Sequence, residues 1–89
     1  MSQNKFKIVY KKSVHRDLKK LSKEEACRIL DQIDDELSKN PESNPVLKGR
    51  FAGLRKYCIG DYRVIYALVS TDILILRIGH RRDVYKSAG

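Results

Sequence analysis

The amino-acid sequence predicts an α+β fold. An N-terminal strand is followed by two helices packed on one face of an antiparallel sheet, which a C-terminal three-stranded meander completes. Three observations predict it: polar and apolar residues alternate near the N-terminus, apolar residues then recur at helical spacing, and short β-branched and aromatic runs separated by turn residues fill the second half. The 89 residues are expected to form a single domain, residues 1–89.

The first strand is predicted at "KFKIVYK", residues 5–11, because every second residue there is apolar. These apolar residues are Phe6, Ile8 and Tyr10. A short amphipathic helix follows, with Val14, Leu18 and Leu21 at positions i, i+4 and i+7. The other face of this helix is basic and carries Lys12, His15, Arg16, Lys19 and Lys20.

A second helix is predicted to begin after Ser22, which forms a capping box with Glu25. Its buried stripe consists of Ala26, Ile29, Leu30, Ile33 and Leu37. The exposed side of this helix is acidic, and the helix-breaking stretch "SKNPESNP", residues 38–45, ends it. The expected pair of helices therefore lies entirely in the first half of the chain.

Three strands are expected in the second half. The run "LRKYCI" leads into Gly60 and Asp61, which predict a hairpin turn, and "YRVIYALV" follows. The residues "STD" turn the chain again before the last strand, "ILILRIG", residues 73–79. Consecutive strands with short turns indicate an antiparallel meander.

The formal net charge of +8 is unevenly distributed. Residues 1–21 and 44–89 each carry +6, whereas residues 22–43 carry −4. Such basic regions favour a polyanionic partner, and the alternative is a soluble basic domain with no nucleic-acid role. Because no apolar run is long enough for a membrane helix or a secretory signal, we expect a cytoplasmic protein. Cys27 and Cys58 lack metal-ligand spacing and are expected to be reduced thiols.

Strand alternation predicts which side chains share a face of the sheet. If the helices cover the face with Ile59, Val64 and Leu76, the uncovered face carries Lys56, Cys58, Arg63 and Arg77. Such a face is either a phosphate-binding surface, since arginine matches phosphate oxygens bidentately, or a solvated surface that prevents aggregation.

The same alternation brings Arg81 to the uncovered face. His80 points to the opposite face unless the strand bends after Gly79, which a glycine permits.

The segment after Gly79 is the strongest candidate for chemistry. His80 stands beside Arg81, Arg82 and Tyr85, and imidazole can take or give a proton near neutral pH. Such a site could cleave RNA without a metal, with a base that deprotonates the 2′-OH and cations that stabilise the phosphoryl charge. The alternative is that His80 is a polar cap at a strand end. No phosphate-binding glycine loop or two-metal carboxylate site is recognisable, so no cofactor or metal is expected.

The stretch "LKGRFAGLRKYCIGDYRVIYALV", followed by "ILRIGHRRDVY", resembles the RelE toxins of bacterial and archaeal toxin–antitoxin systems. The motif "GDYRVIY" is shared with the related ParE toxins, which act on DNA gyrase, whereas "HRRDVY" is similar to the ending of the ribonuclease branch. The resemblance implies a metal-independent endoribonuclease that cuts mRNA in the ribosomal A site, leaves a 2′,3′-cyclic phosphate and stops translation. The alternatives are a gyrase inhibitor that cleaves nothing and a relative that has lost activity.

The resemblance also implies roles for individual residues. Lys56 matches a base or transition-state lysine, Arg63 the phosphate-binding arginine and Arg81 an arginine that stabilises charge at the leaving group. Tyr85 matches a tyrosine that stacks on or orients the nucleotide, and His80 occupies a place where several relatives carry a catalytic histidine. The best-known member of the family has a second strand lysine where this chain has Cys58. His80 would compensate for the missing lysine.

Further contacts to RNA phosphates are expected from residues around this site and on the first helix. These residues are Arg55, Arg77, Arg82, Lys12, Arg16, Lys19 and Lys20. The expected partners are a cognate antitoxin with an acidic extended segment, mRNA and the ribosome, with no membrane. Toxin and antitoxin would then form a hetero-oligomer.

Overall fold

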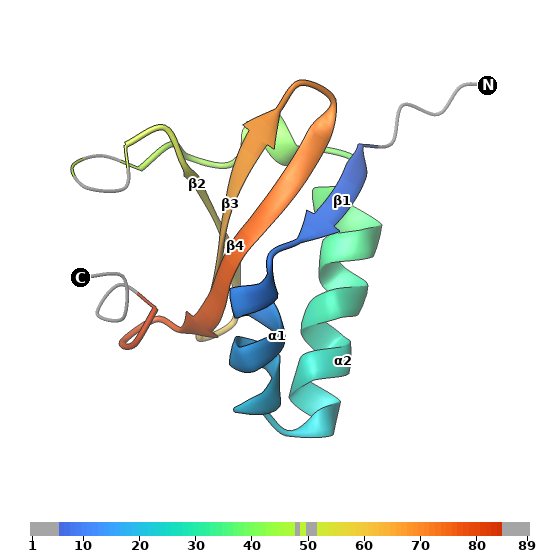
Figure 1. Cartoon of the computed structure of the whole chain (residues 1–89), viewed down its shortest axis with the longest axis vertical. Helices are drawn as coiled ribbons and strands as arrows, with labels where there is room; N and C mark the ends of the chain where they lie inside the picture. Colours follow the sequence, from blue (N-terminus) through green and yellow to red (C-terminus); the bar gives the residue numbers. More distant parts are fainter. Residues whose placement is uncertain (1–5, 48, 50–51, 85–89) are drawn as a thin grey trace.

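The computed structural model describes residues 6–47, 49 and 52–84. The main elements, in chain order, are β1 (Lys7–Tyr10), α1 (Lys12–Lys19), α2 (Lys23–Gln32), β2 (Arg55–Ile59), β3 (Tyr62–Val69) and β4 (Asp72–His80). The strands form one four-stranded sheet in the order β1-β4-β3-β2, and both helices lie on one side of it (Figure 1). The predicted α+β class and order of elements are confirmed.

The meander is antiparallel, as expected, whereas β1 pairs in parallel with β4. The turn between β2 and β3 is Gly60-Asp61, where Gly60 has a φ of 58°. Ser70 has a φ of 62° in the turn between β3 and β4. Two-residue hairpin turns favour positive φ because their twist then matches that of the strands.

The second helix begins at the predicted cap, where the backbone N–H of Glu25 donates to Ser22 Oγ at 3.1 Å. A π-helical turn, Ile33–Leu37, extends α2 and ends with the N–H of Ser38 on the carbonyl of Ile33. None of the helices in the described part of the chain is long and apolar enough to cross a membrane.

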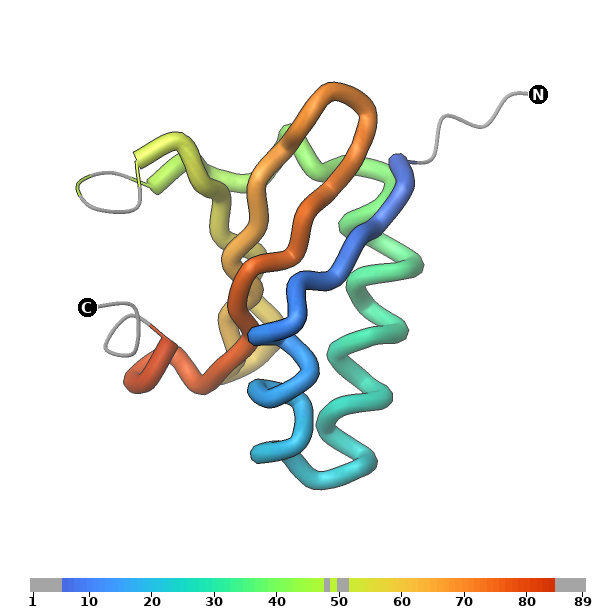
Figure 2. Tube along the Cα trace, in the orientation of Figure 1, coloured from blue at the N-terminus to red at the C-terminus, as the bar shows by residue number. Residues whose placement is uncertain are grey.

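The core lies between the helices and the covered face of the sheet. It consists of Val14, Ile29, Ile33, Leu37, Ile59, Val64, Tyr66, Ile73, Ile75 and Ile78. Tyr66 is fully buried; its hydroxyl donates to the carbonyl of Pro41 and accepts from Asn44 Nδ2 at 3.0 Å. These bonds attach the connection from α2 to β2, which crosses one end of the sheet (Figure 2), to the middle of β3.

An irregularity in β4 changes the expected alternation of side chains. Ile65 pairs with Arg77 and Tyr66 with Ile75, so Leu76 is an extra residue between two pairs. Ile73, Ile75 and Ile78 therefore all belong to the core, although strict alternation would separate them. The expectation that Leu76 lies on the covered face with Ile59 and Val64 is wrong, because Leu76 is not part of the core cluster.

Where β1 ends, side chains of α1 form hydrogen bonds with the edge of β4. The last register pair of the two strands is Tyr10 with Ile75. Ser13 Oγ then donates to the carbonyl of Leu76 at 2.9 Å, and the N–H of Ile78 donates to Asp17 Oδ2 at 3.0 Å. Side chains of α1 thus bind backbone groups of β4 that a longer β1 would have bound.

Candidate functional site

The face of the sheet opposite the helices carries the predicted basic row. Cys58 pairs with Arg63, which pairs in turn with Gly79, and Lys56 pairs with Ile65. Their neighbours along the strands contribute to the core, so these five residues face away from the helices. We call this set the open face. The structure thus brings Lys56, Cys58 and Arg63 together, as the strand alternation predicts.

Lys56 and Arg63 are diagonal neighbours across β2 and β3, a spacing that long side chains can bridge. Arg63 Nη1 donates to the carbonyls of Gly60 and Tyr62 at 2.9 and 3.0 Å, which fixes the guanidinium beside the hairpin turn. Both bonds use Nη1, so the Nε and Nη2 groups retain donors for a ligand anion. Cys58 is an exposed free thiol. Within residues 6–47, 49 and 52–84, no group of side chains has the composition of a metal site.

The segment after β4 folds back towards the open face. The N–H of Arg81 donates to the carbonyl of Asp61 at 2.8 Å, and the N–H groups of Asp83 and Val84 donate to the carbonyl of His80. Val84 is buried, and a Cβ built on Gly79 would lie 3.5 Å from Val84 Cβ. Because Gly79 belongs to the open face, Val84, the last residue of this C-terminal turn (residues 81–84), lies on that side of the sheet.

His80 lies on the other side of the sheet from Lys56 and Arg63. It pairs with Tyr62, and the two rings meet edge to face with centroids 5.8 Å apart and an interplanar angle of 81°. Tyr62 packs against the core, so its register partner His80 is on the helix-covered side. The bend after Gly79 that would turn His80 to the open face is absent, because β4 continues through His80.

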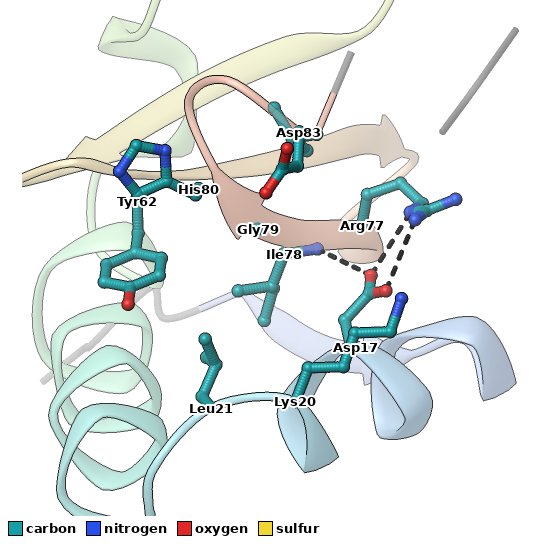
Figure 3. Close-up of a pocket in the computed structure, with 10 residues that line it drawn as sticks. Asp17, Lys20, Leu21, Tyr62, Arg77, Ile78, Gly79, His80 and Asp83 are labelled. Atoms are coloured by element: carbon teal, nitrogen blue, oxygen red, sulfur yellow. Dashed lines mark hydrogen bonds and ion pairs between the residues drawn. The ribbon is translucent and has the colours of Figure 1, made fainter. Parts of the chain in front are cut away.

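Arg77 is bound to α1 and is not a free cation of the open face. Its Nε and Nη2 atoms lie 3.2 and 3.3 Å from the carboxylate oxygens of Asp17, which is 6% exposed (Figure 3). Sequence reasoning missed Asp17. The available signal was its position in the stripe of Val14, Leu18 and Leu21, where an acid is buried only with a partner.

Arg55 is likewise engaged elsewhere. It pairs with Tyr66 on the covered side, and its Nη1 donates to the carbonyls of Glu42 and Asn44 at 3.1 and 2.7 Å. The structure therefore does not bring Arg55 to Lys56 and Arg63. The basic side chains expected to contact RNA from α1 are all exposed, namely Lys12, Arg16, Lys19 and Lys20. Arg81 and Arg82 are also exposed, and Tyr85 lies outside the described residues.

An open pocket of about 380 Å³ lies between the end of α1 and the C-terminal turn. Leu21, Tyr62 and Val84 contribute apolar surface, and Lys20 and His80 contribute polar groups. Figure 3 shows its lining residues around the end of β4, among them Gly79 of the open face, whereas Lys56 and Arg63 do not line it.

Tyr57 has a strongly raised pKa. Its hydroxyl lies 3.1 Å from Glu36 Oε1 and 3.3 Å from Gln32 Oε1. Burial, followed by the hydrogen bond to Glu36 and the charge of that residue, raises the pKa of Tyr57 from 10.0 to about 12. Burial also raises the pKa of Tyr10 and of Tyr66. All three belong to or pack on the core, so none supplies an acid to the open face.

Comparison with known proteins gives one family match. The model of the ParE toxin of type II toxin–antitoxin systems, parDE, matches residues 8–85. No curated protein matches the sequence significantly.

Several solved structures share the fold. The toxin–antitoxin complex RelBE2 from Mycobacterium tuberculosis contains a chain with 26% identity and a TM-score of 0.81, and the match covers 86% of this chain and 99% of that one. The isolated RelE toxin of E. coli matches at 19% identity and a TM-score of 0.65, covering 93% and 94% of the two chains. The chromosomal ParDE system of P. aeruginosa matches at 15% identity and 0.66, covering 88% and 98%.

Proposed function

We propose that this chain, which belongs to the ParE family of toxins of type II toxin–antitoxin systems within the RelE/ParE superfamily, is a metal-independent endoribonuclease that cuts mRNA in the ribosomal A site. A toxin of this kind has a cognate antitoxin as partner, as in the complexes that share its fold. Its site of action would be the cytoplasm, where ribosomes and mRNA are found, and its effect would be to stop translation.

The observation that carries this proposal is the placement of Lys56 and Arg63 as diagonal neighbours on the open face, towards which the C-terminal turn folds back. Cleavage without a metal needs cations at the phosphate more than any other group, because charge gathers on its non-bridging oxygens. The planar fork of Arg63 can bind two of these oxygens while Nη1 remains anchored to the hairpin turn. Arg81, which begins the turn, would stabilise charge at the leaving oxygen.

The proposed reaction is a transesterification. A base removes the proton of the 2′-OH, the 2′-oxygen attacks the adjacent phosphorus, and the bond from phosphorus to the 5′-oxygen breaks. That oxygen takes a proton, and the products are a 2′,3′-cyclic phosphate and a 5′-hydroxyl. Lys56 is the better candidate for the base or for charge stabilisation, because it shares a face with Arg63 and His80 does not. Tyr85 keeps its proposed role of orienting the nucleotide.

A second candidate function is inhibition of DNA gyrase without cleavage. It is favoured by the description of the matched family as ParE toxins and by Cys58 in place of a lysine of the ribonuclease branch. In that case the open face would bind protein, and the cations on it would be dispensable for chemistry.

The test uses the purified toxin with programmed ribosomes, a defined mRNA and primer extension. We expect cuts at codon-spaced positions by the wild type, and loss of these cuts in K56Q and R63Q. The control K39Q changes an exposed lysine after α2 and should cut as the wild type does. Intact mRNA together with inhibition of gyrase supercoiling by the same preparation would overturn the nuclease proposal and support inhibition of DNA gyrase as the function.

A further inference from the structure

His80 accepts three backbone hydrogen bonds from the C-terminal turn. The N–H of Arg82 donates to His80 Nδ1 at 3.2 Å, and the N–H groups of Asp83 and Val84 donate to the His80 carbonyl at 2.8 and 2.9 Å. A fourth hydrogen bond, from the N–H of Arg81 to the carbonyl of Asp61, holds the first residue of the turn. One residue thus receives three of these four bonds.

The contact between Nδ1 and the N–H two residues later has a chemical consequence. A neutral imidazole has one acceptor nitrogen and one N–H. With Nδ1 as the acceptor, the proton of the neutral His80 ring lies on Nε2, which is then a donor and has no lone pair for a proton. The side chain therefore acts as an Asn side chain does in an Asx turn, where an oxygen accepts the N–H two residues on.

We propose that His80 is a positioning residue that caps the C-terminal turn and thereby holds Arg81 beside the open face, and that it transfers no proton. The position of its ring against Tyr62, on the covered side of the sheet, supports this role. The turn carries two adjacent exposed arginines, Arg81 and Arg82, and the Nδ1 acceptor binds the backbone N–H of the second. The activity part of this inference rests on the proposed function, whereas the capping part does not.

The first experiment examines the ring directly by ¹⁵N NMR of the whole toxin. The chain has two histidines, so the variant H15Q, which changes an exposed residue of α1, assigns the His80 signals. At a pH where the ring is neutral, we expect the proton on Nε2 and a slowly exchanging amide at Arg82. A proton on Nδ1 would overturn the proposal whatever the toxin's target is.

The second experiment separates a cap from a proton-transfer group. The variant H80N keeps an acceptor for the N–H of Arg82 but cannot act as a base, whereas H80F keeps a ring against Tyr62 but has no acceptor. We expect H80N to keep the protection of the Arg82 amide and to cleave mRNA within about twofold of the wild type. We expect H80F to lose that protection and to cleave about three- to tenfold more slowly, as the loss of one hydrogen bond predicts.

Equal and severe loss of cleavage in H80N and H80F, with the Arg82 amide still protected in H80N, would show that His80 takes part in the chemistry. If the wild type cleaves no mRNA, the proposed function fails, but amide exchange in the two variants still tests the cap. In that event, equal protection of Arg82 in H80N and H80F would overturn the cap as well.

Discussion

The carboxylate of Asp17 in α1 binds both the side chain and the backbone of the last strand. Its two oxygens lie 3.2 and 3.3 Å from Arg77 Nε and Nη2, and Oδ2 also accepts the N–H of Ile78 at 3.0 Å. One turn earlier on α1, Ser13 Oγ donates to the carbonyl of Leu76. A helix side chain therefore completes the hydrogen bonding of a strand at the point where its neighbouring strand has ended.

We expect Asp17 to be important for stability. In D17A the N–H of Ile78 and the guanidinium of Arg77 both lose a buried partner, so the free energy of unfolding should fall by about 2–4 kcal/mol. D17N keeps an acceptor for Ile78 but not the charge, and should cost about half as much. Urea unfolding measures both differences.

The matched control for Asp17 is the acid of an exposed pair. Asp35 lies 3.6 Å from Lys39, and both side chains are more than half exposed. D35A should therefore change the free energy of unfolding by about 0.5 kcal/mol or less. An equal loss in D17A and D35A would contradict the importance of the Asp17 contacts.

The hydroxyl of Tyr66 should also contribute to stability. The Tyr66 ring is fully buried, and its hydroxyl forms hydrogen bonds with Pro41 and Asn44 in the connection from α2 to β2. Y66F keeps the ring in the core but leaves the carbonyl of Pro41 without that donor, so we expect a loss of about 1–3 kcal/mol. Amide exchange should show the largest change near residue 44, and an even change across the sheet would contradict the local role of the hydroxyl.

The raised pKa of Tyr57 predicts a dependence of stability on alkaline pH. The folded state holds the phenol proton up to about 12, whereas the unfolded chain releases it near 10.0. The unfolded state thus binds fewer protons above that pH, and the free energy of unfolding should fall as the pH rises between these two values. Unfolding of the wild type and Y57F at several pH values measures this, and the fall should be shallower in Y57F.

Glu36 provides the control for the cause of that shift. In E36Q the carboxylate charge is removed while a hydrogen-bonding group remains beside the Tyr57 hydroxyl. The pKa of Tyr57, followed by phenolate absorbance, should then move down towards its ordinary value. An unchanged pKa in E36Q would exclude Glu36 as a cause and leave burial as the main one.

The fold could be predicted from the sequence because it rests on local signals. The cap at Ser22, the turn at Gly60 and the alternating strands each depend on neighbouring residues. The extra residue Leu76 could not be predicted, because the residues before and after it have the pattern of one continuous apolar strand. Strict alternation through this strand therefore places Leu76 on the covered face, where it does not lie.

The candidate site was predictable only where the strands are regular. Lys56, Cys58 and Arg63 lie together because the pairing of β2 with β3 has no irregularity. The role of Arg77 depends on Asp17, a residue 60 positions away, and no local pattern indicates that contact. The orientation of His80 depends on whether a strand ends at a glycine or continues past it, which the sequence leaves open.

The exposed cations of α1 predict how binding to ribosomes depends on salt. Lys12, Arg16 and Lys19 lie at i, i+4 and i+7, on one face of the helix. If this face contacts ribosomal RNA, each cation releases counterions from the phosphates on binding. The triple variant K12Q/R16Q/K19Q should then lower the slope of log affinity against log salt concentration by about 2.

A charge-matched variant, K7Q/K23Q/K39Q, removes three exposed lysines that lie outside α1. Because the two variants have the same net charge, an equal change in slope would mean that overall charge, and not this helix face, attracts the toxin to the ribosome. A change confined to the α1 variant would identify the face that docks.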